Sequence, residues 1–434
     1  MINKVKHIVC CCLACCAVST VFTSCLKDQE DLFELSASER LQTKIDKVRQ
    51  TLRDGVYGWE LEYYPGNRQD YGGIVYTVRF DSLTATVGCS LMPDSFVTSY
   101  YKISNDNGPV LTFDTYNQLL HYFSTPSSGE YEAKGGEFEF VVNEVSDTLI
   151  TLYGKKTRNT IYLRRFNGPA DDYAQKAVCM FDSIAAGFTG TIGGIAVEGR
   201  ISIMDKQLTV DVEGRSVVMP FAFTDKGIHL YQPLSIGGVA VQTLAYDIAT
   251  NRFTCLDANT SDVVFDGILA SDDVVRFADY AGNYTLRYNG RTTTSVSLVP
   301  SRMDGTYRLR GLSPHYEVVL RYEHTTGNLI LAPQVVGDIN GASVYLLTFS
   351  STTGSVWLAE DASLTLTWNK NKARVAYNFS ATNPDSYPCD SAILYMIYYD
   401  EDGNASARSV TDAEWLVNGS AMLTSLVSLQ RQNR

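Results

Sequence analysis

Short segments in which apolar and polar residues alternate recur along most of this chain. In Ile74–Phe80 every second residue is large and apolar, and Phe138 and Phe140 alternate with glutamates in the same way. Because successive side chains of a β-strand point to opposite faces, this period of two is typical of antiparallel strands with one buried face. Turn pairs such as Asn289-Gly290 separate many of the segments and provide glycine where positive φ is needed. The sequence therefore predicts a mainly β fold of antiparallel barrels or sandwiches.

Helical periodicity is found in two short segments. Residues 41–52 carry apolar side chains at steps of four, three and four, behind a Ser36-x-x-Glu39 capping box and ahead of Gly55. Residues 173–184 show a similar apolar stripe behind Pro169 and stop before Gly187. We therefore expect two short amphipathic helices, each of which opens a β-rich stretch.

The helices and strands divide the chain into three β units. We expect a helix plus an N-terminal β domain over residues 36–168, a helix plus a middle β unit over 169–275, and a C-terminal β domain over 276–434. Three units agree with the length of the chain, because a domain commonly has about 150 residues. The third unit opens with Gly282-x-Tyr284 and continues in regularly spaced strands, which resembles lipocalin-like barrels. That resemblance implies a closed sheet able to enclose one small ligand.

The N-terminus has the pattern of a secretory leader. Lys4 and Lys6 precede Ile8–Phe22, an uncharged and almost wholly apolar run. A helix needs about 20 apolar residues to cross the hydrocarbon core, so this run is too short for a membrane span. We predict a signal peptide over residues 1–24.

The end of the leader resembles the lipobox of bacterial lipoproteins. Phe22-Thr23-Ser24 places an apolar residue and two small ones directly before Cys25. The resemblance implies that Cys25 becomes a lipidated N-terminus and that residues 25–35 form a lipidated, flexible tether. Plain secretion and an unprocessed anchor are the alternatives. Several buried acyl chains, at about 0.8 kcal/mol per CH₂ group, make an anchor effectively permanent.

Residues 27–31, Lys-Asp-Gln-Glu-Asp, form a short acidic cluster behind the expected anchor. The cluster resembles the export signal that carries Bacteroidetes lipoproteins to the outer face of the outer membrane. A solvated tether without a sorting role is the alternative. We expect an outer-membrane, lipid-anchored protein exposed at the cell surface.

The net charge of the chain argues against nucleic acid as a partner. The formal charge of −12 becomes −14 once Lys4 and Lys6 leave with the leader, and no basic patch indicates nucleic acid as a partner.

Of ten cysteines, those outside the leader and the expected anchor are Cys89, Cys179, Cys255 and Cys389. They lie far apart in sequence without a C-x-x-C pair, so we expect buried free thiols, with disulfides or a metal site as alternatives.

The chain carries few signatures of catalysis. It lacks a His-Glu-x-x-His zinc motif, a Gly-x-Ser-x-Gly elbow and a Walker-type phosphate loop. His315 and His324 could meet on adjacent strands as metal or haem ligands, but two unrelated turn or surface histidines are the simpler interpretation. Glu137 and Glu139 share one face of a predicted strand, which we expect to face solvent. We therefore predict no catalytic residues, no metal site, no cofactor and no enzymatic activity.

Aromatic residues provide the ligand-binding candidates. The chain has 27 tyrosines and 4 tryptophans, whose rings serve either sheet packing or stacking on sugars and flat apolar ligands. Trp59, Tyr63, Tyr64 and Tyr71 lie close in sequence near a predicted turn. We treat these four as candidate ligand-binding residues, with packing as the alternative.

Several segments resemble one family. Tyr57-Gly58-Trp59, Tyr71-Gly72-Gly73 and above all residues 108–124 are similar to an uncharacterised Bacteroidetes surface lipoprotein family, registered as domain of unknown function four-three-zero-two. The similarity is most specific over residues 57–126 and extends in length and order over nearly all the mature chain. It implies an outer-membrane lipoprotein, often encoded beside importers of the starch-utilisation type and their capture lipoproteins. It implies no substrate and no functional residues.

Three functions remain open. The first is a non-catalytic accessory module that captures a small ligand, such as a glycan or haem, for a nutrient importer. The second is a structural or adhesive envelope protein, which predicts protein partners and no concave site. The third is an enzyme of unrecognised mechanism, which requires polar groups that converge in a pocket. An exposed aromatic patch or a barrel cavity would favour the first.

Overall fold

The computed structural model of this chain describes residues 36–106, 108–126, 133–260, 262–370, 374–399 and 405–432. The predicted signal peptide, Cys25 and the predicted tether lie outside the described residues. The described strands form three closed antiparallel barrels of eight strands each and one further six-stranded sheet. The mainly β prediction is therefore confirmed. Among these residues, no helix combines the length and the apolar character that a bilayer span requires.

Barrel 1 follows helix α2 (Ala37–Arg53), whose predicted capping box forms between Ser36 and Glu39. The barrel consists of β1 (Trp59–Tyr63), β2 (Ile74–Phe80), β3 (Thr84–Cys89), β4 (Met92–Asn105), β5 (Pro109–Phe113), β6 (Glu139–Val145), β7 (Leu149–Gly154) and β8 (Thr160–Arg165). It closes where β1 pairs with β8. The apolar face of α2 is buried, and the helix packs against β4 and β5.

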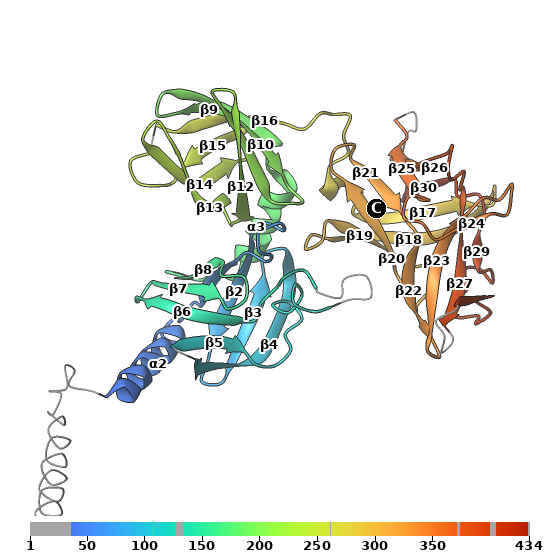
Figure 1. Ribbon diagram of the computed structural model, residues 1–434. Helices are drawn as coiled ribbons and strands as arrows, with labels where there is room; N and C mark the ends of the chain where they lie inside the picture. The colour runs from blue at the N-terminus through green and yellow to red at the C-terminus, as the bar shows by residue number, and fades with distance from the viewer. Residues whose placement is uncertain are drawn as a thin grey trace, which may run out of the picture.

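Barrel 2 repeats this plan behind helix α3 (Tyr173–Ser183). Its strands are β9 (Gly187–Ile192), β10 (Ile195–Ser202), β11 (Gln207–Val212), β12 (Arg215–Phe223), β13 (Gly227–Ile236), β14 (Val239–Asp247), β15 (Arg252–Cys255) and β16 (Val264–Ile268). The barrel closes where β9 pairs with β16. Helix α3 contacts both β4 and β12, so it lies between barrels 1 and 2 (Figure 1).

Barrel 3 begins after the short 3₁₀ helix η1 (Phe277–Tyr280). Its strands are β17 (Gly282–Tyr288), β18 (Thr292–Ser301), β19 (Thr306–Arg310), β20 (Val318–Glu323), β21 (Asn328–Leu331), β25 (Leu364–Trp368), β26 (Ala376–Ala381) and β30 (Ser428–Arg431). The remaining strands form the separate sheet: β22 (Gln334–Ile339), β23 (Ala342–Phe349), β24 (Val356–Trp357), β27 (Ser391–Tyr399), β28 (Ala405–Ser409) and β29 (Met422–Leu423).

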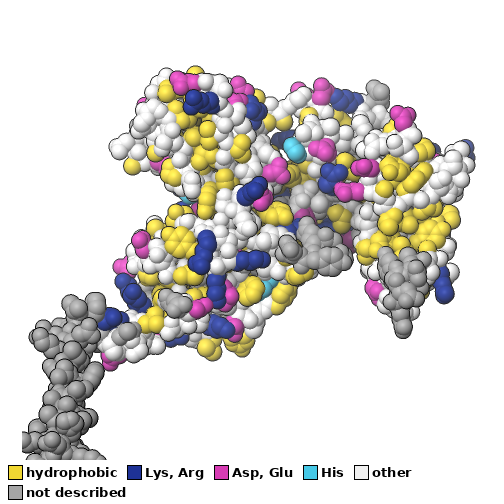
Figure 2. Space-filling model, viewed as in Figure 1, with side chains coloured by type: hydrophobic (Ala, Val, Ile, Leu, Met, Phe, Trp, Pro, Cys, Tyr) yellow, Lys and Arg dark blue, Asp and Glu magenta, His cyan; other side chains and the backbone are white. Residues whose placement is uncertain are grey.

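This separate sheet is absent from the sequence-based expectation of one continuous C-terminal barrel. The central strand β23 is largely apolar on both faces, so it needs cover on both sides. Val344 and Leu346 belong to the main core, whereas Leu347 and Phe349 form a second small cluster with Ile393 on the other face. Figure 2 shows hydrophobic side chains gathered over this sheet.

The interior of barrel 3 is filled by its own aromatic side chains. Tyr280, Tyr284, Tyr307 and Tyr377 are all fully buried, and the rings of Tyr280 and Tyr377 lie 4.5 Å apart. These rings occupy the space that a ligand takes in a lipocalin-like barrel. A binding site must therefore be sought outside the interior of barrel 3.

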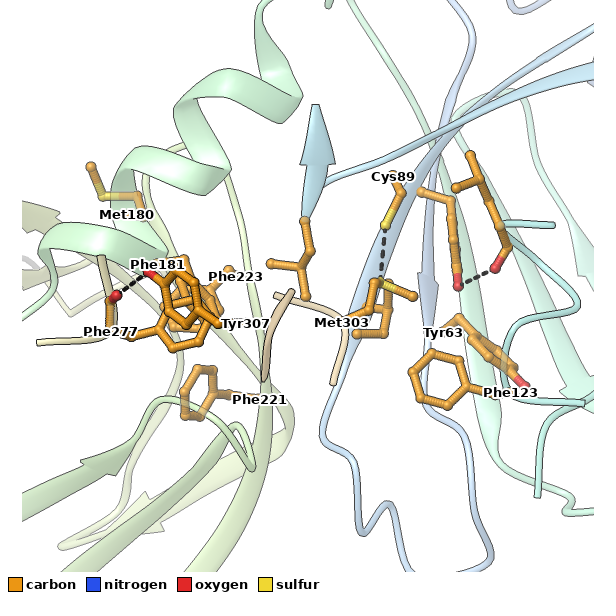
Figure 3. Packing of buried hydrophobic residues seen from close by; sticks show 14 of the residues in the cluster. Tyr63, Cys89, Phe123, Met180, Phe181, Phe221, Phe223, Phe277, Met303 and Tyr307 are labelled. Carbon is orange, nitrogen blue, oxygen red and sulfur yellow. Dashed lines mark hydrogen bonds between the residues drawn. The ribbon is translucent and has the colours of Figure 1, made fainter. Parts of the chain in front are cut away.

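The turn between β18 and β19 joins barrel 3 to the other two barrels. Met303 Sδ lies 3.5 Å from Cys89 Sγ in barrel 1 (Figure 3). Arg302 forms two hydrogen bonds of 3.0 and 2.6 Å to Asp182 in α3. The rings of Phe181, Phe223, Phe277 and Tyr307 pack together here from α3, β12, η1 and β19. A single hydrophobic core consequently runs through the three barrels.

Candidate functional site

The four aromatic residues singled out from the sequence lie mostly in the core. Trp59, Tyr63 and Tyr64 are 0, 2 and 1 % exposed, and Tyr71 is partly buried with its ring 5.6 Å from that of Phe123. Trp59 donates a hydrogen bond to the carbonyl of Leu52, as part of the contact between α2 and barrel 1. We therefore assign these four residues to packing, which is the alternative to the predicted ligand-binding role.

A groove on the outer face of barrel 1 presents a different set of side chains. Its volume is about 400 Å³. It is lined by Tyr57, Gly58, Thr77, Val78, Arg79, Thr86, Phe96, Ala170 and Asp171, and we call it the Phe96 groove. The floor consists of outward-facing residues of β2, β3 and β4, and one wall is the segment that leads into α3.

The Phe96 ring lies close to a glycine of the neighbouring strand. In the β3–β4 register Phe96 pairs with Gly88, and a Cβ on Gly88 would lie only 2.8 Å from the Phe96 ring and 2.7 Å from Thr77 Oγ1. The ring thus lies close to the Gly88 backbone, while 60 % of the residue remains exposed. Tyr57, 43 % exposed, lies beside it in the groove, next to Gly58.

Gly58 is required at the edge of the groove for two reasons. Its φ is +87°, and a Cβ there would lie 2.9 Å from the carbonyl oxygen of Val78. Only glycine combines a positive φ with so close an approach to β2 at little cost. The turn between α2 and β1 therefore places Tyr57 next to β2.

Three polar side chains of the Phe96 groove have no partner among the described residues. Arg79 and Asp171 are exposed, and neither forms a hydrogen bond or an ion pair with any of the described residues. The same holds for the hydroxyl of Tyr57 within the described ranges. Thr86 instead shares a 2.8 Å hydrogen bond with Thr98 on the neighbouring strand. The groove thus offers a guanidinium, a carboxylate and a hydroxyl around an exposed aromatic ring.

A buried polar network lies beside this groove, between barrels 1 and 2. Glu62 of β1 accepts hydrogen bonds from Tyr64 at 2.6 Å and from Arg164, and its Oε1 lies 2.8 Å from His229 Nδ1 of barrel 2. Burial alone would raise the pKa of Glu62, but the interactions with His229, Arg164 and Tyr64 outweigh it and lower that pKa below its usual value. The network thus holds a charged carboxylate inside the contact between the two barrels.

Glu60 belongs to the same network but behaves differently. It contacts Arg164 at 3.5 Å and accepts a 3.0 Å hydrogen bond from Tyr173 of α3. Burial, and then the neighbouring charge of Glu62, raise the pKa of Glu60. Since Tyr173 is the first residue of α3, this bond fixes the helix, and with it the Asp171 wall of the Phe96 groove, against β1.

A larger cleft of about 520 Å³ lies between α3, the segment before η1 and barrel 3. Among its charged groups, Asp272 forms no hydrogen bond or ion pair with a described residue, whereas both arginines have partners. Arg276 forms a two-bond ion pair with Asp279, and Arg431 binds the Tyr284 hydroxyl and backbone carbonyls. The Phe96 groove, with its unengaged groups, is the better candidate for ligand binding.

The remaining sequence candidates lie apart from both sites. Glu137 is buried rather than solvent-facing, because the chain folds its carboxylate onto the backbone N–H of Thr157, and burial raises its pKa. Glu139 pairs with Lys155. His315 stacks on Trp415 instead of approaching His324. Among the described residues, no group of three or more His, Cys, Asp or Glu side chains could hold a metal ion.

The four cysteines are all free thiols. Cys89, Cys255 and Cys389 are buried, as expected, but Cys179 is exposed. Its position explains the difference, because Cys179 lies on the face of α3 opposite the stripe of Tyr173, Ala177 and Phe181 that packs inward.

Sequence reasoning missed the Phe96 groove because its residues come from five separate segments. The available signal was weak: Phe96 stands at an outward position of an alternating strand, where a polar residue is usual. Its glycine partner becomes visible only once the β3–β4 register is known.

Comparison with known families gives two matches. Residues 256–395 match the model of DUF4987, a domain of unknown function. A search of curated proteins finds no match for this chain. Residues 29–248, which are just over half of the chain and include α2, barrel 1, α3 and most of barrel 2, match the model of DUF4302, also a domain of unknown function. The chain therefore belongs to the DUF4302 family.

Proposed function

We propose that this protein is a non-catalytic, lipid-anchored protein of the outer-membrane surface that captures a ligand for a nutrient importer. The leader, the lipobox-like segment ending at Cys25 and the acidic cluster behind it support the anchor and the location. The resemblance to Bacteroidetes surface lipoproteins supports the partnership with an importer and its capture lipoproteins.

The Phe96 groove is the observation that carries the binding role. It is concave, it exposes an aromatic ring, and its guanidinium, carboxylate and phenol groups are all unengaged. A few convergent polar groups around an apolar surface are the usual composition of a ligand site. A purely structural or adhesive protein has no need of such a groove.

The composition of the groove supports binding rather than catalysis. Its lining includes one carboxylate, Asp171, and no histidine, cysteine or serine. Glycoside hydrolysis usually requires two carboxyl groups that flank the reacting bond, and acyl transfer requires a nucleophile beside a base. The buried pair of Glu62 and His229 does not change this view, because Glu62 is enclosed between the barrels.

A thermal-shift screen against glycans, haem and divalent metals tests the binding role. A ligand at a hundredfold excess over its Kd adds about 2.7 kcal/mol of apparent stability. We expect a shift with one ligand class in the parent protein and none in the Phe96→Ala/Arg79→Ala double variant. An equal shift in both proteins would contradict the groove as the site, and no shift in either would favour a structural protein.

Protease treatment of intact cells tests the location. A surface-displayed protein is degraded without disruption of the outer membrane, whereas a periplasmic control protein survives. Survival of the protein in intact cells, followed by degradation once the periplasm is opened, would contradict surface display.

A further inference from the structure

We infer that the Phe96 groove binds a neutral saccharide unit, with Phe96 against the C–H face of the sugar ring and Arg79 and Asp171 on its hydroxyls. This inference rests on the proposed function and names the ligand class for the same site. Three features of the groove carry it: the exposed rings, the charge balance and the pairing state of the strands beneath.

The exposed rings select a ligand with a flat apolar face. The Phe96 ring lies close to Gly88 and the residue is 60 % exposed, so a ligand can reach the ring without any rearrangement of the sheet. Tyr57 adds a second ring and a hydroxyl at the same groove. Amphipathic rings of this kind combine apolar contact with hydrogen bonding. The pyranose ring has a matching apolar face and a rim of hydroxyl groups.

The charge balance selects a neutral ligand with both donors and acceptors. Arg79 can only donate hydrogen bonds and an ionised Asp171 can only accept them, so the pair satisfies both halves of a hydroxyl-bearing ligand. The carboxylate of Asp171 would repel a strongly anionic ligand, and the guanidinium of Arg79 would repel a strongly cationic one. Since neither side chain is engaged by another described residue, neither has to give up an internal partner when a ligand binds.

The strands beneath the groove disfavour an extended peptide. β2 pairs with β1 and β3, and β3 pairs with β2 and β4, inside a closed barrel. The backbone groups of β2 and β3 are therefore already used, and neither strand offers a free edge for strand addition, which is the common way to bind extended peptides. β4 pairs with β3 at Phe96 and with β5 only at Tyr101–Asn105. Over β2 and β3, recognition of a ligand therefore proceeds through side chains.

The test uses the full-length protein in detergent and three oligosaccharide series of similar length. Neutral cello-, malto-, xylo- and manno-hexaoses are compared with anionic oligogalacturonate and with cationic, deacetylated chitohexaose by isothermal titration calorimetry. We expect binding of at least one neutral series. Phe96→Ala, Arg79→Ala and Asp171→Asn should each weaken that binding, by about tenfold for loss of the stacking ring.

Tyr116→Ala is the matched control, because Tyr116 is 65 % exposed on the same barrel but does not line the groove. The Tyr116→Ala variant should bind the neutral series with the same affinity as the parent protein. Circular dichroism and the melting temperature show whether each variant is folded, and Asp171→Asn changes one exposed side chain with little risk to the fold.

The outcomes separate the two proposals. Binding of only a charged series, lost in Phe96→Ala, would overturn the neutral-saccharide inference and leave the groove as a capture site. Binding of a neutral series that is unchanged in all three groove variants would overturn the inference as well. An absence of binding to every series and to the thermal-shift panel would overturn both.

Discussion

Glu62 and His229 are 167 residues apart in sequence, yet their side chains meet at 2.8 Å in the contact between barrels 1 and 2. Glu62 is almost completely buried, and it also binds Arg164 and Tyr64 of its own barrel. A buried charge is tolerated only where partners replace the lost water. The pair therefore couples the packing of the two barrels to the ionisation of one carboxylate.

The first prediction concerns Glu62→Gln. Removal of the charge leaves Arg164 poorly compensated, and we expect the free energy of unfolding at pH 7 to fall by about 3 kcal/mol. The pKa of Glu62 lies below its usual value of 4.5, so its stabilisation is present above that pH and is lost as the pH falls through the lowered pKa. The difference between parent and variant should therefore shrink between pH 5 and pH 3.

Urea denaturation of both proteins across this pH range provides the measurement. Glu198→Gln is the control, because Glu198 is exposed and forms no ion pair with any residue in the described ranges. A difference between parent and Glu62→Gln that does not change with pH would show that the charge of Glu62 is not responsible.

The second prediction concerns Lys206, which is buried where barrels 1 and 2 meet. Burial lowers its pKa to about 8, and its ammonium group donates to the carbonyl of Met204. The unfolded chain keeps this proton up to about pH 10.5, so the folded protein gains stability as the pH rises from 8 towards 10.5. Lys206→Met should be more stable than the parent at pH 7, by about 3 kcal/mol, and the difference should shrink as the pH rises from 8 towards 10.5.

Guanidinium denaturation at several pH values between 7 and 10 measures this effect. Lys226→Met, at an exposed lysine, should show no such pH-dependent difference. A stability gain in Lys206→Met that stays constant over the whole range would contradict a perturbed lysine.

The third prediction concerns Gly88→Ala. The added Cβ would lie within 2.8 Å of both the Phe96 ring and Thr77 Oγ1, so the ring has to leave its position over the sheet. We expect loss of ligand binding at the Phe96 groove, together with a destabilisation of about 1 kcal/mol. Gly168→Ala is the control, since a Cβ at Gly168 meets no atom within 4 Å. Unchanged binding in Gly88→Ala would argue against a stacking role for Phe96.

The fourth prediction concerns thiol reactivity. Cys179 is exposed on α3, whereas burial raises the pKa of Cys89 to about 12 and also raises the pKa of Cys255 and Cys389. Because the thiolate is the reactive form, Cys179 should react quickly with Ellman's reagent under native conditions and the other three only after denaturation. Cys179→Ser should abolish the fast phase, and a fast phase that persists in this variant would contradict the prediction.

Local patterns in the sequence were enough to predict the elements of this fold. Alternation over segments such as Ile74–Phe80 predicted strands, and the capping box at Ser36 and Glu39 predicted the start of α2, because both depend on neighbours only a few residues away. The family was also recognisable from local segments such as residues 108–124, in agreement with the match to DUF4302.

Only the tertiary structure decided which faces are buried by other barrels and which remain open. Glu60 and Glu62 point outward from β1 like surface residues, and only the arrival of His229 and Tyr173 from barrel 2 and α3 buries them. Phe96 and Trp59 are both large aromatic residues on strands of one barrel, yet Trp59 lies under α2 while Phe96 lies on Gly88 in the open. Strand register and barrel contacts join residues far apart in sequence, and local periodicity contains no information about such contacts.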